Sequence, residues 1–444
     1  MIKSSIVFLN KIADFRQHWF IRNVATLQVG SFGGTLVQAV SGIFIARILQ
    51  PELFGVYSLS IGLAALAGLL LGAGMQDAVA TLVGSAYAQK NDEELRNALA
   101  FLLKITFYVG LATLAIFIFI PSVAQYFYNN SLIGWYAGIV VLGVFFSSSF
   151  NAVVQLSLQV AGRIKSMALL VFGDQFLRSG FALLFVFIGL GVLGGVSGQL
   201  AGAAFIFVIS IFVWGGLRKV YNIFPSLRDL IGYTRRVSVA RYIGFSLWVA
   251  VDRNMGNLFM ALPVVLTGIY VSTVEVSYFK LAFGYLNLAL SLLGPISTLL
   301  NMEFPRIQIQ DVDKLRKTFI KISVFGLTIS TFLTLGAVAV SSIAFRILYG
   351  ESFMPSVNYV LGLIAYGALF GIGVGLGPMW RAINKVKVSI AINLIVLGIG
   401  IPMGLWLISS YGLWGSVIMV TLWFTVSHGA SFIYLIRELR RKVL

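Results

Sequence analysis

The chain has 444 residues, of which 59% are hydrophobic and 11% are charged, and its mean hydropathy is +0.95. A soluble globular domain carries about 25% charged residues, so this composition excludes an ordinary soluble protein. The sequence has no cysteine, which excludes a disulfide, a thiolate zinc site and a cysteine nucleophile. The formal net charge of +17 would suggest a nucleic-acid partner only if the protein were soluble.

Apolar stretches recur along the whole chain, and each is long enough to cross the roughly 30 Å hydrocarbon layer as a helix. The alternating pattern of a membrane barrel does not occur in the sequence. We therefore predict an all-α polytopic membrane protein with about twelve transmembrane helices. The predicted spans lie within 24–47, 54–76, 98–120, 132–158, 166–189, 194–216, 240–261, 276–302, 317–341, 355–380, 387–408 and 412–436.

Most of the 32 lysines and arginines fall on one side of this arrangement if the N-terminus is cytoplasmic. The connections on the other side then hold two, Arg47 and Arg346. Such a bias follows the positive-inside rule, so we predict that both termini are cytoplasmic. The positive charge is then a topological signal together with an attraction to anionic lipid, and no nucleic acid is needed to explain it.

An internal repeat relates the two halves of the chain. The stretch that begins at Val56 parallels the one that begins at Ser277, and Tyr57 pairs with Tyr278. Two copies of about six spans each, an even number, share one orientation, so the predicted lobes are parallel repeats with a cavity between them.

The predicted domains follow from this repeat and from apolar residues that recur at helical spacing near the N-terminus. Apolar residues at helical spacing before the first span predict an interfacial helix at 1–22. We expect an N-lobe at 23–216, a basic cytoplasmic linker at 217–238, and a C-lobe at 239–444.

Two stretches carry a family resemblance. The segment from Phe44 to Gly84, "FIARILQPELFGVYSLSIGLAALAGLLLGAGMQDAVATLVG", and "MEFPRIQ", Met302 to Gln308, resemble the polysaccharide transport family of the multidrug/oligosaccharidyl-lipid/polysaccharide exporter superfamily. That family includes the O-antigen-type lipid-linked oligosaccharide flippases. The resemblance implies a V-shaped transporter in a bacterial or archaeal cytoplasmic membrane, which moves undecaprenyl-diphosphate-linked sugar to the outer leaflet. The expected partners are the lipid-linked oligosaccharide, membrane lipids and glycan-assembly enzymes, and no cofactor is expected.

The sequence departs from the related lipid II flippases in its first span. Their first span carries an arginine and an aspartate in the cavity, whereas "LVQAVSGIFIA", Leu36 to Ala46, has no charge here. The site of those flippases is therefore not carried over to this chain.

Charged residues inside the predicted spans are the candidate site. A charged side chain at the bilayer centre costs roughly 2.5–3.5 kcal/mol, so such residues normally face a partner or a wet cavity. Arginine and lysine bind phosphate oxygens well at low dielectric. We predict that the substrate diphosphate binds cations that face the cavity. These are Arg178, Arg253, Lys280 and, at the outer end of the first span, Arg47.

Each of these roles has a structural alternative. Asp174 stands one helical turn from Arg178, so the two charges could neutralise each other and fix helix packing. Arg47 could instead be an interfacial anchor whose head group reaches toward water. Asp174 and Asp252 are the predicted ion-coupling carboxylates. Pro295 is a predicted hinge, with a static kink as the alternative.

Three functions remain after the motifs are considered. The sequence lacks the phosphate loop of ATPases and an H-E-x-x-H zinc motif. We expect a flippase for lipid-linked oligosaccharide that works by alternating access. A cation-coupled multidrug exporter is the alternative. Its cationic substrates would favour buried acids, whereas the charged residues inside the predicted spans include slightly more cations than acids. A membrane glycan polymerase or ligase is disfavoured, because the outside connection 121–134 has no acid, lysine, arginine or histidine.

Overall fold

The computed structural model describes residues 19–70 and 75–441, and every regular element in these ranges is a helix. The predicted interfacial helix falls mostly on residues 1–18, which lie outside the described residues. The first half of the chain comprises α2 (Trp19–Leu70), α3 (Met75–Ala88), α4 (Asp92–Phe117), α5 (Ile120–Tyr128), α6 (Ser131–Ser149), α7 (Asn151–Val160), α8 (Ile164–Phe185), the π-helical turn η1 (Val186–Leu190) and α9 (Gly191–Val220).

A short helix, α10 (Leu227–Arg236), lies between the two halves. The second half comprises α11 (Val239–Thr267), α12 (Thr273–Leu290), η2 (Ser291–Leu293), α13 (Gly294–Gln310), α14 (Val312–Leu348), η3 (Glu351–Phe353), α15 (Ser356–Gly362), α16 (Ile364–Phe370), η4 (Gly371–Gly375), α17 (Leu376–Ala382), α18 (Val386–Tyr411) and α19 (Leu413–Arg441).

The described helices supply the twelve predicted membrane crossings. Eight helical stretches are long and apolar enough to span a membrane, and the bent pair Ser356–Gly362 and Ile364–Ala382 makes a ninth. Two of the eight each contain two crossings. The stretch Ala25–Leu69 bends at Gln50, between the first and second crossings. The stretch Ile164–Val220 turns back at Gly189 and Gly191, which have φ of 93° and 58°. The 29-residue α11 completes the set. The predicted fold class, all-α and polytopic, is confirmed.

The corner at Gln50 follows from the residue after it. Pro51 disfavours helical backbone at the preceding residue, which accounts for the extended ψ of 171° at Gln50; the positive φ of 59° there is not explained by the proline. The Gln50 side chain donates to the Arg47 carbonyl oxygen at 2.6 Å, which helps to close the end of the first span. The chain thus reverses direction within a single residue.

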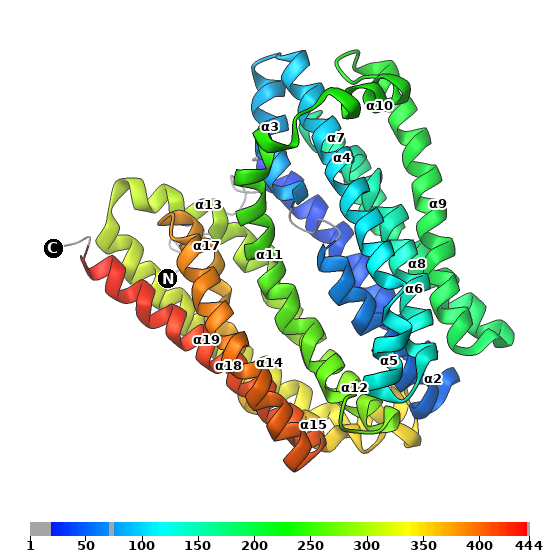
Figure 1. Cartoon of the computed structure of the whole chain (residues 1–444). Coiled ribbons are helices and arrows are strands. Elements are labelled where there is room, and N and C mark those ends of the chain that lie inside the picture. Colours follow the sequence, from blue (N-terminus) through cyan, green and yellow to red (C-terminus); the bar gives the residue numbers. More distant parts are fainter. Residues whose placement is uncertain (1–18, 71–74, 442–444) are drawn as a thin grey trace, which may run out of the picture.

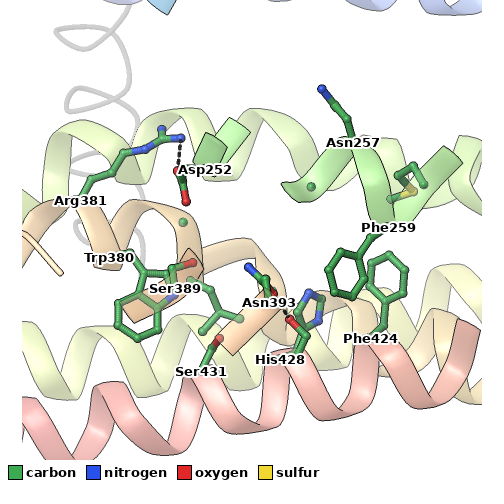
Figure 2. Close-up of a pocket in the computed structure, with 16 residues that line it drawn as sticks. Asp252, Asn257, Phe259, Trp380, Arg381, Ser389, Asn393, Phe424, His428 and Ser431 are labelled. Carbon is green, nitrogen blue, oxygen red and sulfur yellow. Dashed lines mark hydrogen bonds and ion pairs between the residues drawn. The ribbon is translucent and has the colours of Figure 1, made fainter. Parts of the chain in front are cut away.

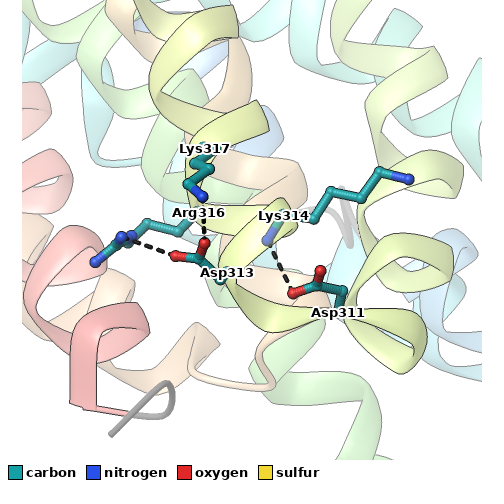
Figure 3. A network of polar contacts seen from close by, with 5 residues as sticks. All are labelled: Asp311, Asp313, Lys314, Arg316 and Lys317. Carbon is teal, nitrogen blue, oxygen red and sulfur yellow. Dashed lines mark hydrogen bonds and ion pairs between the residues drawn. The ribbon is translucent and has the colours of Figure 1, made fainter.

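Some helices extend well beyond their apolar cores. The apolar pattern predicts a span at 317–341, whereas α14 covers Val312–Leu348. Its first turns are stabilised by polar contacts (Figure 3): Asp311 accepts from the Lys314 backbone N–H at 3.0 Å, and Asp313 lies 2.7 Å from Arg316 and 2.6 Å from Lys317. The N-cap and the ion pairs between residues three or four positions apart stabilise the helix beyond the membrane, where hydropathy does not predict a helix.

The helices form two groups (Figure 1). The group from α2 to α9, blue to green, lies on one side, and α13, α14 and α17 to α19, yellow-green to red, lie on the other. One end of the molecule holds α10, and we call it the α10 end; the opposite end holds α5 and α15, and we call it the α5 end. Within the N-lobe, α8 and α9 pack closely, because Gly198 and Gly202 lie against the backbone of Ala182 and Arg178.

The two lobes are sealed against each other at the α5 end. A methyl group built on Gly55 would overlap the Thr273 carbonyl oxygen, so α2 and α12 are in backbone contact there. Tyr128 donates to the Val265 carbonyl oxygen at 3.1 Å. Two further residues at this end, Ser352 of η3 and Gln50, form a hydrogen bond of 2.9 Å.

Candidate substrate cavity and coupling pocket

A cavity of about 380 Å³ lies between the lobes. The N-lobe lines it with α2, Ser179 of α8 and Gln199 of α9. The C-lobe lines it mainly with α12 and with Tyr349, which follows α14. This volume lies within the range of small-molecule pockets. We call it the central cavity.

Lys280 is the one charged side chain among the described residues that line the central cavity. It lies on α12 one turn from Gly284, where no side chain fills the space. Within the described part of the chain, its ammonium has no hydrogen-bond or ion-pair partner. An unpaired cation in an inter-lobe cavity is suited to an anionic ligand.

Neutral polar groups continue this lining along α12. Tyr285 donates to the Ala337 carbonyl oxygen at 2.9 Å. Asn287 donates to the Phe283 carbonyl oxygen at 2.9 Å and accepts from the Tyr366 hydroxyl at 2.6 Å. These side chains are held in fixed orientations, as groups that recognise a ligand must be.

Asp174 and Arg178 do not form an ion pair, although they stand one turn apart on α8. Arg178 instead donates from Nε to Gln199 Oε1 at 3.2 Å, across to α9. Asp174 has a buried carboxylate oxygen without a hydrogen-bond partner among the described residues. Neither charge lines the central cavity, but Gln199 does. Arg178 therefore acts on the central cavity indirectly, by orienting the side-chain amide of Gln199.

Of the other predicted site residues, Arg47 and Pro295 lie apart from the central cavity. Arg47 borders a lateral groove between α2 and α8 and donates to the Ile347 carbonyl oxygen at 3.5 Å. The side chain of Arg253 lies outside the described residues, so its role stays a prediction. Pro295 sits in the first turn of α13, directly after the 3₁₀ turn η2 that interrupts the eighth span.

A second pocket, of about 330 Å³, lies within the C-lobe, and we call it the C-lobe pocket (Figure 2). Asp252 of α11 lines it and lies 3.8 Å from Arg381. Asn393 of α18 also lines it and accepts from the Ser427 hydroxyl of α19 at 2.7 Å. The pocket thus brings a carboxylate, an amide and hydroxyls from three helices together.

Sequence reasoning from charge alone does not find the neutral members of these sites. Gln199, Asn287 and Asn393 are amides in apolar spans, and that polarity is the signal that marks them. Which face each amide takes depends on helix rotation, which the apolar pattern of a fully hydrophobic span leaves undetermined.

The comparison with family models decides the family. The model described as polysaccharide biosynthesis protein matches residues 44–358, from α2 into α15, which is more than two thirds of the chain. The chain belongs to the polysaccharide biosynthesis protein family. The predicted family resemblance is confirmed.

Solved structures share the fold of this polysaccharide biosynthesis protein. A multidrug resistance MATE family transporter of the MOP superfamily, in an inward-facing conformation, has a TM-score of 0.70 at 17% identity, covering 92% of this chain and 96% of its own. An outward-facing structure of such a transporter has a TM-score of 0.62 at 17% identity, covering 94% and 96%.

The lipid II flippase MurJ, in an inward closed conformation, has a TM-score of 0.72 at 12% identity, covering 93% of this chain and 87% of its own. No curated protein matches the chain. At these identities the likeness establishes the fold, in which two lobes of transmembrane helices are arranged as in MOP superfamily transporters. The chain is thus a multi-pass membrane protein of a polysaccharide biosynthesis family with a transporter fold.

Proposed function

We propose that this protein is a flippase that moves undecaprenyl-diphosphate-linked oligosaccharide across a bacterial or archaeal cytoplasmic membrane for surface polysaccharide synthesis. The observation that carries the proposal is the unpaired cation of Lys280 in the central cavity, in a chain that belongs to a polysaccharide biosynthesis family. A diphosphate would contact this ammonium, while the neutral polar groups of the cavity contact sugar hydroxyls.

Alternating access of the two lobes supplies the mechanism. Contacts of Gly55 and Tyr128 close the α5 end, and the higher TM-score with an inward-facing transporter supports an inward-facing state. We expect the α10 end to face the cytoplasm, because Arg47 and Arg346 lie at the α5 end and most other basic residues lie at the opposite end. The prenyl chain would stay in lipid while the head group crosses.

Asp252 is the carboxylate that we assign to ion coupling. It lines the C-lobe pocket with Asn393 and Ser427, whose oxygen atoms suit a hard cation. Asp174 is the weaker of the two predicted coupling acids, since it lines neither of these cavities. Movement of an ion or proton at Asp252 would change its attraction to Arg381 and so the ion pair that links α11 to α17.

A multidrug exporter is the second candidate function, supported by the fold likeness to MATE transporters and by a carboxylate in the C-lobe. Drug cations would be repelled by Lys280, because the described lining of the central cavity offers no acid to neutralise it. The charge of the cavity therefore favours an anionic substrate.

Reconstitution distinguishes the two functions. Purified protein in liposomes would be given a labelled polyprenyl-diphosphate oligosaccharide in one arm and a fluorescent cationic drug in the other. We expect the sugar to become accessible to a periodate or lectin probe in the opposite leaflet, at a rate above that of protein-free liposomes. Drug accumulation with no movement of the oligosaccharide would overturn the flippase function.

A further inference from the structure

A third pocket, unrelated to the central cavity, lies at the α10 end beside the segment that joins the lobes. Its volume is about 510 Å³, and its lining includes four arginines, which come from α4, the last turn of α9 and α10. We call it the arginine pocket, and these residues are Arg96, Arg218, Arg228 and Arg236.

Local sequence fixes the walls of the arginine pocket. Phe224 and Leu230 are buried and anchor the linker and α10 on the N-lobe. The N-terminus of α10 is held by a capping box, in which Ser226 accepts from the Asp229 backbone N–H at 3.0 Å and the Asp229 carboxylate accepts from the Ser226 backbone N–H at 3.3 Å. The arginines of α10 are therefore presented by a positioned helix.

The charge of the pocket is not balanced by its own acids. Asp229 is the one carboxylate among its described lining residues, and Asp92 lies 3.8 Å from Arg96. The Ser226 hydroxyl and, after it, the charges of Arg218 and Arg96 hold the pKa of Asp229 below its ordinary value, so this acid is ionised at neutral pH.

Positive charge nonetheless remains in excess. Arg218, Arg228 and Arg236 form no ion pair with any residue that the structure describes. In addition, Arg96 has a buried Nε without a hydrogen-bond partner in the described part. Guanidinium groups grouped around a cavity match the oxygen atoms of phosphate in geometry and in charge.

We propose that the arginine pocket binds a phosphate-bearing anion, either the head group of an anionic lipid or a free phosphate compound. The ligand would bridge Arg96 and Arg218, on the N-lobe, to Arg228 and Arg236, on the linker helix. Its binding would hold α10 against α4 and thereby restrain the segment that connects the lobes. The proposal does not depend on the identity of the transported substrate.

Binding to the purified full-length protein tests the site and its source of phosphate. One arm titrates inorganic pyrophosphate and the other titrates short-chain phosphatidic acid, with phosphatidylcholine as the neutral lipid, and each is followed by calorimetry and by the rise in Tm. The double variant Arg218→Gln with Arg228→Gln removes two guanidiniums from the pocket. Arg235→Gln is the matched control, because Arg235 is exposed on the same helix and does not line the pocket.

We expect the double variant to bind at least about tenfold more weakly than the native chain, because it lacks two guanidinium groups that would hydrogen-bond to the anion. The Arg235→Gln variant should bind like the native chain. Binding of pyrophosphate supports a free phosphate ligand, and binding of phosphatidic acid alone supports a lipid head group. The proposal is overturned if neither ligand binds, or if the control loses as much affinity as the double variant. Circular dichroism of each variant verifies that the helices are intact.

Discussion

Replacing Lys280 by methionine separates substrate binding from folding. Methionine is close to lysine in length and removes only the charge, so the central cavity keeps its shape. Lys280 makes no polar contact with a described residue in the absence of substrate, which means that the change breaks no structural interaction. The whole effect on function should therefore come from the lost contact with the substrate.

The magnitude follows from the chemistry of that contact. A hydrogen bond to an ionised group contributes about 1.5–3 kcal/mol, which corresponds to about 10- to 150-fold in affinity. In the same variant, the stability should stay level or rise, because an unpaired cation at membrane depth costs roughly 2.5–3.5 kcal/mol on insertion scales. Lower affinity together with an unchanged or higher Tm is the expected signature.

The assay measures the concentration dependence of oligosaccharide flipping in liposomes, together with Tm in detergent. Lys280→Arg keeps the charge and should retain most of the activity, and Lys165→Met is the control, since Lys165 is exposed at the start of α8. Unchanged flipping by Lys280→Met would refute the role assigned to this cation. A fall in Tm with a proportional loss of activity would show that the lysine is structural.

Three further changes test other parts of the structure. Gly55→Val should force α2 away from Thr273 and open the α5 end, which spin labels on α2 and α12 would report as a longer distance; an unchanged distance contradicts the seal. Asp252→Asn should abolish the dependence of transport on sodium or on a proton gradient, and a retained dependence would move the coupling site elsewhere. The pKa of Asp229 is lowered chiefly by its hydrogen bond with Ser226, so its contribution to capping α10 is present above pH of about 4 and is lost as the pH falls through the lowered pKa. The protection of the α10 amides from hydrogen exchange, measured relative to the intrinsic exchange rate at each pH, should fall in that acidic window, and in Ser226→Ala the fall should begin at higher pH; no difference between the two chains would contradict the capping role.

Hydropathy predicts the number and order of the crossings because each crossing must bury its backbone polar groups in a helix about 30 Å long. It is less informative about helix ends. The stretch Ile164–Val220 turns back at Gly189 and Gly191 within the outer connection, and α14 starts five residues before its predicted span. Caps and backbone conformation, rather than hydrophobicity, decide these positions.

Charge in an apolar span marks polar environments but does not say which residue faces a cavity. Asp174 and Arg178 share a face of α8, yet the arginine bonds to Gln199 on the next helix instead of to the acid. In the sequence, Lys280 is a similar charge within an apolar span, and in the structure it lines the central cavity. The difference arises from the packing of α8 on α9 and of α12 on α2, which are long-range contacts with no local pattern in the sequence.

A thiol-protection measurement tests the central claim most directly, because the native chain has no cysteine. Gly284 lines the central cavity and a Cβ added there meets no atom within 4 Å, so Gly284→Cys places one thiol beside Lys280. We predict that a water-soluble maleimide modifies this thiol, and that saturating lipid-linked oligosaccharide slows the reaction at least about tenfold. Under the same conditions, the thiol of Ser238→Cys, in the exposed segment before α11, should react at an unchanged rate. Equal reaction rates at position 284 with and without the oligosaccharide would contradict a substrate site between the lobes.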